Sequence, residues 1–237
     1  MWKILAELGH EIVETCPSLF SFTFERSKLA DLTGLSVPNA EVSVEIGKRY
    51  TQSGPLLVTH KGASGPAVLK LSAFAAHAFK SVEYITEVMI NWASVSKSDF
   101  DFEIENRRKN SPSSGVMQNP MFQLPRRLWE YLVRRAGIPP VKNWADLNKT
   151  ELDVLADEVM KSRFKMIGQT KNKEEFVTAG GVSRAEIDFR TMESKLVPGL
   201  FFAGEVIDID GVTGGFNFQN AWTTATLAAG AIASDLG

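Results

Sequence analysis

The feature that most constrains the fold is a glycine-dense segment near the C-terminus, residues 200–221. An apolar run at 200–203 is followed by a Gly-Glu pair at 204–205, by the string Thr-Gly-Gly-Phe-Asn at 213–217, and by a stretch rich in alanine and threonine. This order predicts a strand, a tight turn and a helix. The backbone N–H groups of the turn then lie at a helix N-terminus, where partial positive charge favours an anionic or electron-rich ligand.

The same segment supplies most of the predicted cofactor-binding residues. A glycine at 204 lets the main chain approach a phosphate or a ribityl chain, and the adjacent carboxylate accepts hydrogen bonds from ligand hydroxyls. Two glycines before the helix permit backbone geometries that residues with a Cβ avoid. The candidates are Gly204, Glu205, Gly214, Gly215, Phe216 and Asn217. The alternative is a plain surface turn that caps a core helix.

The strand–turn–helix order is typical of the closing half of a dinucleotide-binding domain. Such a domain normally opens with G-x-G-x-x-G, and no such string lies near residue 1. We therefore expect part of a flavoenzyme that lacks the N-terminal half of its FAD-binding domain.

Composition narrows the classes of partner and compartment. The net charge of −2 gives no electrostatic case for nucleic acid. One cysteine, Cys16, excludes an intramolecular disulfide framework and fits a reducing compartment, so we predict a cytoplasmic protein. No run of 18 apolar residues and no signal-peptide pattern is present, so no membrane partner is predicted. With one cysteine and three scattered histidines a zinc site lacks ligands, and Asp208 and Asp210 lack the further carboxylates of a calcium site.

Hydrophobic periodicity predicts a mixed α+β chain. The first nine residues indicate a helix that ends at Gly9. Alternation and turn signals then predict strands at 19–24, 42–46, 54–59 and 82–91, turns at Asn39-Ala and Gly47-Lys-Arg, and a helix at 67–79.

A different texture begins near residue 96. Helices are predicted at 99–109, at 124–136 with Gly137 closing it, and from an N-cap at Thr150 through Lys161, before strands return at 163–170 and 175–179. We predict a β-rich substrate domain at 1–96 that resumes at 163–195, a helical insert domain at 97–162, and a C-terminal segment of an FAD-binding domain at 196–237.

A second candidate constellation is His60, Lys61 and Ser64, between a predicted strand and a predicted helix. Binding groups often occupy such a place. His60 changes charge near neutrality and suits a general acid or base, although a turn with a half-buried histidine is the alternative. A Ser–His nucleophile pair is disfavoured because G-x-S-x-G is absent.

A third constellation, Val177 to Ser183 with Thr178 among its candidates, contains a strand that ends in Gly180-Gly181. Paired glycines allow close approach to a flat ring, and a β-bulge is the alternative. Several other residues are expected to be structural: His10 and His77 as isolated histidines, Cys16 as a buried small apolar group, and Trp129, Trp144 and Trp222 as core.

Taken together, the strings at 54–66, 178–182 and 191–219 resemble the predicted NAD(P)/FAD-dependent oxidoreductases, a family that includes aminoacetone oxidases and bile-acid-reducing flavoproteins. The resemblance implies a β-barrel-like substrate domain and a helical domain inserted in a discontinuous Rossmann-like FAD domain. It implies hydride transfer between a small-molecule substrate or NAD(P)H and FAD. Glu205 and Gly215 match flavin-contacting positions, Gly180, Gly181 and residues 214–217 would line the ring, and His60, Lys61 and Ser64 would face the substrate.

Without the N-terminal half, the resemblance implies weak or no FAD binding, an inactive fragment, and self-association through an exposed sheet edge. Two further hypotheses stay open. One is a non-catalytic binding or assembly module derived from that family, and the other is a hydrolase that uses His60 and Ser64.

Overall fold

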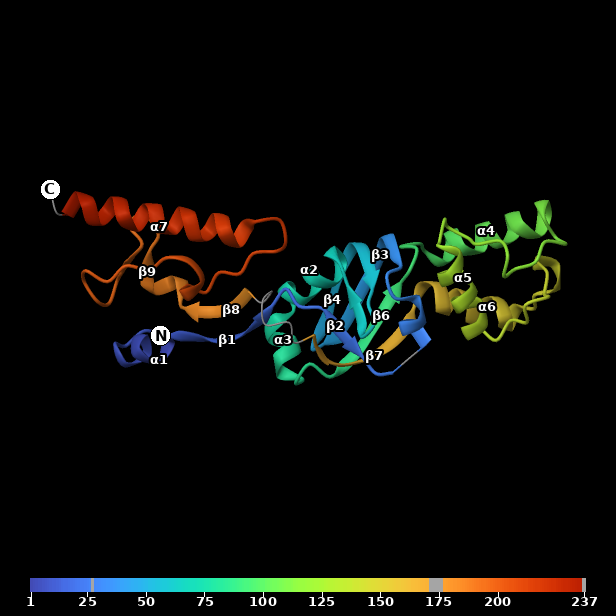
Figure 1. The fold of residues 1–237 in the computed structure, drawn as a ribbon, viewed down its shortest axis with the longest axis horizontal. Coiled ribbons are helices and arrows are strands. Elements are labelled where there is room, and N and C mark those ends of the chain that lie inside the picture. Colours follow the sequence, from blue (N-terminus) through green and yellow to red (C-terminus); the bar gives the residue numbers. More distant parts are fainter. Residues whose placement is uncertain (27, 171–176, 236–237) are drawn as a thin grey trace. The chain divides into compact units, whose positions relative to one another are not determined.

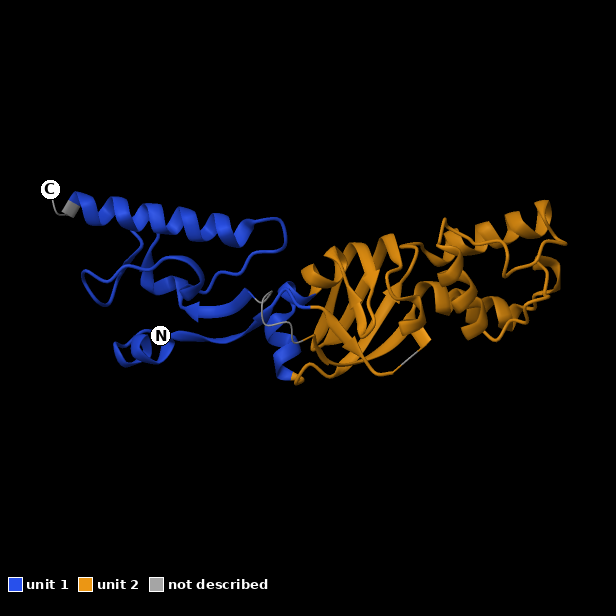
Figure 2. Ribbon diagram, viewed as in Figure 1, with its two compact units in different colours: residues 1–20, 72–81, 171–237 blue, residues 21–71, 82–170 orange. Residues whose placement is uncertain are grey.

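A computed structural model describes residues 1–26, 28–170 and 177–235 of the chain. The chain divides into two compact units, coloured separately in Figure 2. Unit 1 contains Met1–Phe20, Ser72–Ser81 and Lys171–Gly237, and unit 2 contains Ser21–Leu71 and Val82–Thr170. Each is described by itself below. The predicted strand at 175–179 begins among residues that lie outside the described ones.

Unit 2 contains a β-barrel, drawn as a ribbon in Figure 1. The barrel is closed, with the strand order β2-β5-β4-β3-β6-β7. The strands are β2 (Phe22–Phe24), β3 (Ser36–Ile46), β4 (Lys48–Val58), β5 (Gly62–Ser64), β6 (Thr86–Asn91) and β7 (Ser162–Gln169). All neighbouring pairs are antiparallel. Closure removes free strand edges. The predicted mixed fold with a barrel is confirmed.

The barrel is filled by alternate side chains of its strands. Val42, Leu56 and Ile90 are fully buried, and each comes from a different strand. The rings of Phe24 and Phe164 stack with centroids 5.2 Å apart. Each such side chain contributes about 1.5–3 kcal/mol by leaving water, so the barrel has a core of its own.

The longest hairpin tests two predicted turns. Gly47 joins β3 to β4 with φ +68°, as predicted. The predicted turn at Asn39-Ala40 is wrong, because both residues lie within β3. The register against β4 shifts between Val37 and Ala40. The turn-like residues mark a β-bulge, which bends a long strand without ending it.

The helical part of unit 2 consists of α4 (Lys97–Asn110), α5 (Arg126–Arg135) and α6 (Lys149–Met160). Both α4 and α6 begin with a capping box, formed by Ser96 with Asp99 and by Asn148 with Glu151. The predicted N-cap at Thr150 is wrong. Asn148 takes the position because its side chain and that of Glu151 satisfy each other's backbone N–H groups.

Other expectations for the helices are met in part. Trp129 and Trp144 are fully buried, as predicted. Gly137, with φ +73°, follows α5. The helix predicted at 67–79 is divided into α2 (Pro66–Phe74) and α3 (Ala76–Ser81). None of the described helices combines the length and apolarity that crossing a membrane requires.

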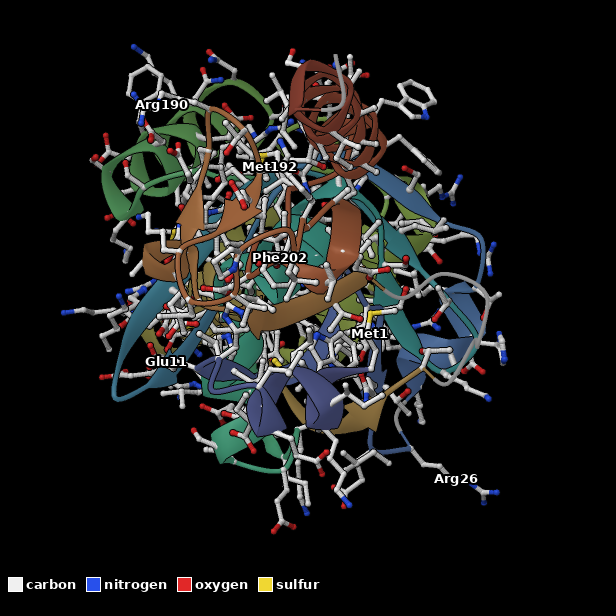
Figure 3. All side chains as sticks on the ribbon, turned by 90° about the vertical axis from the view of Figure 1, so that its left-hand side faces the viewer. Met1, Glu11, Arg26, Arg190, Met192 and Phe202 are labelled. Atoms are coloured by element: carbon white, nitrogen blue, oxygen red, sulfur yellow. The ribbon has the colours of Figure 1, made fainter. Side chains whose placement is uncertain are left out.

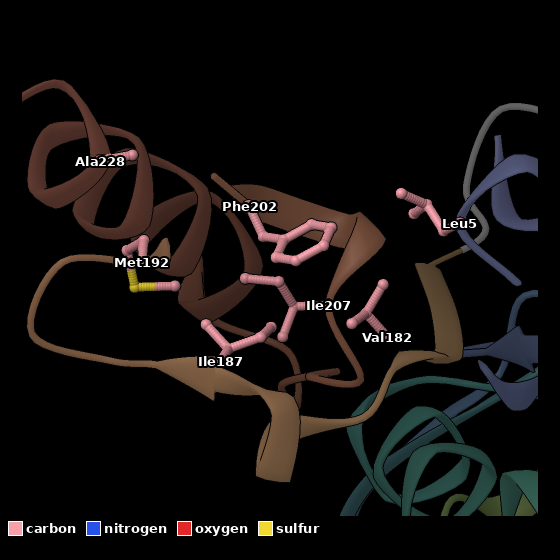
Figure 4. Close-up of a cluster of buried hydrophobic side chains, with 7 residues drawn as sticks. All are labelled: Leu5, Val182, Ile187, Met192, Phe202, Ile207 and Ala228. Carbon is pink, nitrogen blue, oxygen red and sulfur yellow. The ribbon is translucent and has the colours of Figure 1, made fainter. Parts of the chain in front are cut away.

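Unit 1 is built from α1 (Trp2–Glu7), the antiparallel pair β1 (Ile12–Ser18) and β8 (Val177–Val182), the helix α3, the short pair β9 (Ile187–Asp188) and β10 (Glu193–Ser194), and α7 (Phe216–Asp235). Gly9, with φ +96°, follows α1 as predicted. Seven buried side chains form its core, drawn in Figure 4: Leu5, Val182, Ile187, Met192, Phe202, Ile207 and Ala228. In Figure 3 Arg190 points away from this cluster into solvent.

The C-terminal segment differs from its prediction in one respect. The turn and the helix are present, and α7 begins at Phe216. The predicted strand at Leu200–Ala203 is reduced to one bridge, between Phe201 and Glu193. A strand is defined by its ladder, and a single bridge does not extend it. Trp222 is a second correction, because its side chain on α7 is 66% exposed instead of buried.

Candidate functional site

A hollow of about 570 Å³ lies in unit 1 at the start of α7, and we call it the C-terminal hollow. It brings together four of the predicted cofactor-binding residues, Glu205, Gly214, Gly215 and Asn217. Most of its other lining side chains are apolar, among them Leu19, Val177 and Ile209. An apolar wall with a few polar groups is typical of small-molecule sites.

Two glycines shape the turn at the rim of the C-terminal hollow. Gly214 and Gly215 have φ +115° and +87°, a region that residues with a Cβ rarely adopt. The carbonyl of Gly215 accepts the N–H of Gln219 at 3.0 Å, which starts the first turn of α7. Asn217 and Phe218, in the first turn of α7, also line the hollow, and the backbone N–H groups of a helix's first turn favour negative charge.

Glu205 joins two segments beside the hollow. It lies in the short helix η4 (Gly204–Val206), and its Oε1 accepts the backbone N–H of Thr178 in β8 at 2.5 Å. The predicted residues Thr178 and Glu205 are thus direct partners. A charge-assisted bond of this kind holds the carboxylate in one position beside the hollow.

Asn217 holds the turn closed. Its Oδ1 accepts the N–H of Gly211 at 2.7 Å, and its Nδ2 donates to the carbonyl of Gly211 at 3.0 Å. Both polar groups of the amide are therefore occupied. The structure gives Asn217 a part in shaping the hollow.

Gly204 and Phe216 are predicted residues that do not line the hollow. The N–H of Gly204 donates to Oγ1 of Thr224 at 2.9 Å, which links η4 to α7. Phe216 is 58% exposed. Gly204 thus contributes to the packing that positions its neighbour Glu205.

Gly180 and Gly181 are required by close backbone contacts. A Cβ on Gly180 would lie 2.4 Å from the carbonyl oxygen of Glu14, and one on Gly181 would lie 2.4 Å from that of Val206. The pairing of β1 with β8 shifts register at this point. These contacts fit the bulge alternative, and a flavin-lining role for the two glycines stays a prediction.

His60, Lys61 and Ser64 belong to unit 2. His60 and Lys61 form the exposed turn between β4 and β5, whereas Ser64 ends β5. The Oγ of Ser64 bonds to the Oγ of Ser21 at 2.6 Å. Among the described residues no hydrogen bond joins His60 to Ser64, so the geometry offers no nucleophile pair. Their role on the substrate side stays a prediction.

Sequence reasoning missed a buried histidine network in unit 1. His10 Nδ1 lies 2.8 Å from Glu186 Oε2, and His10 Nε2 lies 3.1 Å from Ser194 Oγ. These distances resemble those of a nucleophilic triad. However, Ser194 is 6% exposed, and its Oγ already accepts the N–H groups of Leu196 and Val197. The network is a clasp between distant segments, and no local signal in the sequence indicates it.

A second pair was also missed. Cys16 Sγ lies 3.7 Å from Nδ1 of His77, and burial raises the pKa of the thiol. Cys16 is buried, as predicted, and pairs with Ala179 across β1 and β8. Nearby, Ser18 Oγ donates to Asp210 Oδ2 at 2.7 Å, which ties the end of β1 to the loop before α7. Within the described residues no three metal-ligating side chains gather.

Comparison with known proteins identifies a family for the barrel and helical parts of the chain. The profile described as "HI0933-like protein barrel and H2TH domain" matches residues 16–177. The ribosomal RNA dihydrouridine synthase of Escherichia coli is 32% identical over 228 residues, which cover 94% of this chain and 54% of that protein. The protein of the same name from Haemophilus influenzae is 31% identical over 226 residues, or 94% of this chain and 53% of the relative.

A third relative is more distant. The 3-dehydro-bile acid delta(4,6)-reductase of Clostridium scindens is 24% identical over 242 residues, which cover 98% of this chain and 57% of the reductase. This chain thus spans about half the length of the curated relatives it matches.

Proposed function

This chain belongs to the family of HI0933-like proteins with a barrel and an H2TH domain, and we propose that it forms the barrel, helical and C-terminal parts of a flavin-dependent reductase. The observation that carries the proposal is the C-terminal hollow, where Glu205, Gly214 and Gly215 meet at the start of α7. The likeness to the bile-acid reductase supports it as well.

The residues of the hollow fit part of a flavin. Its glycine turn leaves room for a flat ring, because a Cβ on Gly215 would meet no atom within 4 Å. The N–H groups at the start of α7 would stabilise negative charge on the reduced ring. Glu205 would accept hydrogen bonds from ribityl hydroxyls, and the apolar wall would exclude water. When bound, FAD supplies hydride chemistry, with NAD(P)H as the proposed electron source.

We propose uridine in ribosomal RNA as the substrate, because two relatives above 30% identity have names that state this product. The C5–C6 double bond of uracil is conjugated to a carbonyl, so its reduction needs one hydride and one proton. The small-molecule substrate predicted from the sequence is the alternative, supported by the bile-acid reductase at 24% identity. The two alternatives share one class of reaction and differ in what the protein must bind.

A flavin titration tests the hollow. We expect saturable quenching of FAD fluorescence with a dissociation constant of about 10 μM to 1 mM, because only part of a dinucleotide would be contacted. Glu205→Gln and Gly215→Ala should each weaken binding about tenfold, which is about 1.4 kcal/mol. Glu7→Gln, an exposed carboxylate of unit 1, is the control. Absence of saturable quenching up to about 1 mM, or equal affinity in all four proteins, would overturn the proposal.

A genetic comparison tests the substrate. Ribosomal RNA from cells that lack the gene should contain less dihydrouridine than RNA from wild-type cells, as measured by mass spectrometry of nucleosides. Unchanged dihydrouridine would remove ribosomal RNA as the substrate. Flavin binding together with that result would leave the small-molecule alternative.

A further inference from the structure

The outward face of α5 is unusually basic for a protein whose net charge is −2. The helix reads Arg-Arg-Leu-Trp-Glu-Tyr-Leu-Val-Arg-Arg, and its buried side chains are Leu128, Trp129, Leu132 and Val133. The remaining positions place two arginines at each end of the exposed face. These ten residues thus contain four arginines and one carboxylate, that of Glu130.

Charge at the start of α5 does not serve the helix. Arg126 and Arg127 occupy the first turn, which contains no acidic residue and has no side-chain cap. Cations near a helix N-terminus oppose the positive end of the helix dipole. Residues that work against their own element are expected where a function requires them.

The same face borders a hollow of about 460 Å³ within unit 2, which we call the arginine hollow. Its walls come from α5 and from the short helix η1 (Lys28–Leu32). Four cationic side chains line it, against two carboxylates: the cations are Lys28, Arg127, Arg134 and Arg135, and the carboxylates are Asp31 and Glu130. The local balance is therefore positive, unlike that of the whole chain.

The four cations of the arginine hollow differ in how far carboxylates neutralise them. Arg127 Nη2 donates to the backbone carbonyl of Asp31 at 2.6 Å, which leaves its other N–H donors available. Arg134 is 67% exposed and lies 3.9 Å from Glu130, beyond hydrogen-bond distance. Within the described residues, Lys28 makes no hydrogen bond or ion pair. Arg135 differs, because Glu158 pairs with it at 2.7 Å.

We infer that the arginine hollow binds phosphate groups of an RNA strand. The inference rests on the proposed function, since it assigns a binding surface to the proposed RNA substrate. The two arginine pairs are eight residues apart, about 12 Å along the helix axis. The carboxylate of Glu130 lies between them, bonded to Arg126 at 2.9 Å, and disfavours an anion at the centre. A ligand with spaced anions and an uncharged middle fits this pattern, as a nucleic-acid strand does, and arginine binds phosphate in a bidentate manner.

Fluorescence anisotropy with a labelled single-stranded RNA of about 20 nucleotides, in the absence of flavin, tests the inference on the full chain. The double variant Arg127→Ala/Arg134→Ala should bind at least about tenfold more weakly than wild type. The slope of log affinity against log salt should fall by about 0.7 for each phosphate that the variant no longer neutralises. The control Arg49→Ala/Arg163→Ala removes two exposed arginines from β4 and β7 and should change affinity less than about threefold.

A third variant guards against misfolding as an explanation. Glu130→Gln removes the central carboxylate and should tighten RNA binding several-fold, which a damaged protein cannot do. Equal affinities and salt slopes in all variants, or no RNA binding by wild type, would overturn the inference. If the arginine variants bind RNA normally while deletion of the gene lowers dihydrouridine, this inference fails and the proposed function stands.

Discussion

The two units differ in how their strands are paired and in how completely their apolar side chains are buried. Unit 2 closes six strands into a barrel and buries aromatic and aliphatic side chains completely. Unit 1 has two two-stranded sheets, a core cluster of seven residues, and a helix, α7, that carries five exposed large apolar side chains. Exposed on α7 are Phe216, Phe218, Trp222, Leu227 and Ile232. No charged residue occurs between Asp210 and Asp235.

This difference shows that one chain can combine a region that buries its apolar side chains with a region that leaves several of them exposed. Large apolar side chains on a helix normally face a core and are covered. The predicted self-association through a sheet edge stays a prediction, and the α7 face offers a second route to it. Four experiments test this difference between the two units.

The largest effect is expected in the barrel. Phe164→Ala removes a ring that stacks on Phe24 and meets Trp92 edge to face, so the free energy of unfolding should fall by about 3–5 kcal/mol. Chemical denaturation followed by tryptophan fluorescence measures it. Ile167→Ala, on the same strand but 46% exposed, should change stability by less than about 1 kcal/mol. Equal losses from the two variants would mean that the barrel core is not what stabilises unit 2.

In unit 1 the clasp at His10 should matter most. His10→Ala removes the ring that bonds to both Glu186 and Ser194, which should cost about 1–3 kcal/mol. Hydrogen exchange read by mass spectrometry should show faster exchange in unit 1 and unchanged exchange in unit 2. The control His60→Ala alters an exposed turn and should leave both units as they are. A change spread evenly over both units would show that they unfold together.

Glycine replacements separate strain from simple flexibility. Gly180→Ala pushes a Cβ to 2.4 Å from the carbonyl of Glu14 at φ +89° and should cost about 1–3 kcal/mol. Gly230→Ala, inside α7 with no atom within 4 Å of the added Cβ, should instead stabilise by about 0.5–1 kcal/mol. Thermal unfolding by circular dichroism gives both values. If Gly180→Ala is neutral, the bulge between β1 and β8 tolerates a side chain and the glycine serves another purpose.

The smallest effect concerns Cys16. Burial raises the pKa of this thiol, so the folded chain should react slowly with iodoacetamide at pH 7–8 and much faster in denaturant. The folded state holds its proton to a higher pH than the unfolded state does. Stability linked to Cys16 is therefore complete below the unfolded pKa and falls as pH rises above it. Fast alkylation of the folded chain at pH 7, measured by mass spectrometry, would contradict the buried position.

What the sequence could predict follows the range of the interaction. The turn at 213–217 and the helix after it were predictable, because glycine conformation and helix signals are local. Glu205, Gly214, Gly215 and Asn217 meet in one hollow for the same reason, since they lie within 13 positions of one another. The N-cap at Asn148 was also predictable, because Glu151 follows Asn148 by three positions, which is the spacing of a capping box.

Other features depend on contacts that no local pattern encodes. His10 finds Glu186 and Ser194 across 176 and 184 positions. Trp222 is a large aromatic residue of the kind expected in a core, yet it is exposed, because its burial depends on what covers α7. Asn39 and Ala40 resemble a turn, and the ladder with β4 overrides that preference.

The amide of Asn217 grips Gly211 with two bonds at once, one to the N–H and one to the carbonyl. Opening this loop breaks both hydrogen bonds together, at a cost of about 1–3 kcal/mol. A ligand that fits the closed loop can bind without breaking these hydrogen bonds, whereas a bulkier ligand must break them first. In the proposed flavin site, Asn217 would therefore favour ligands that match the shape of the closed loop.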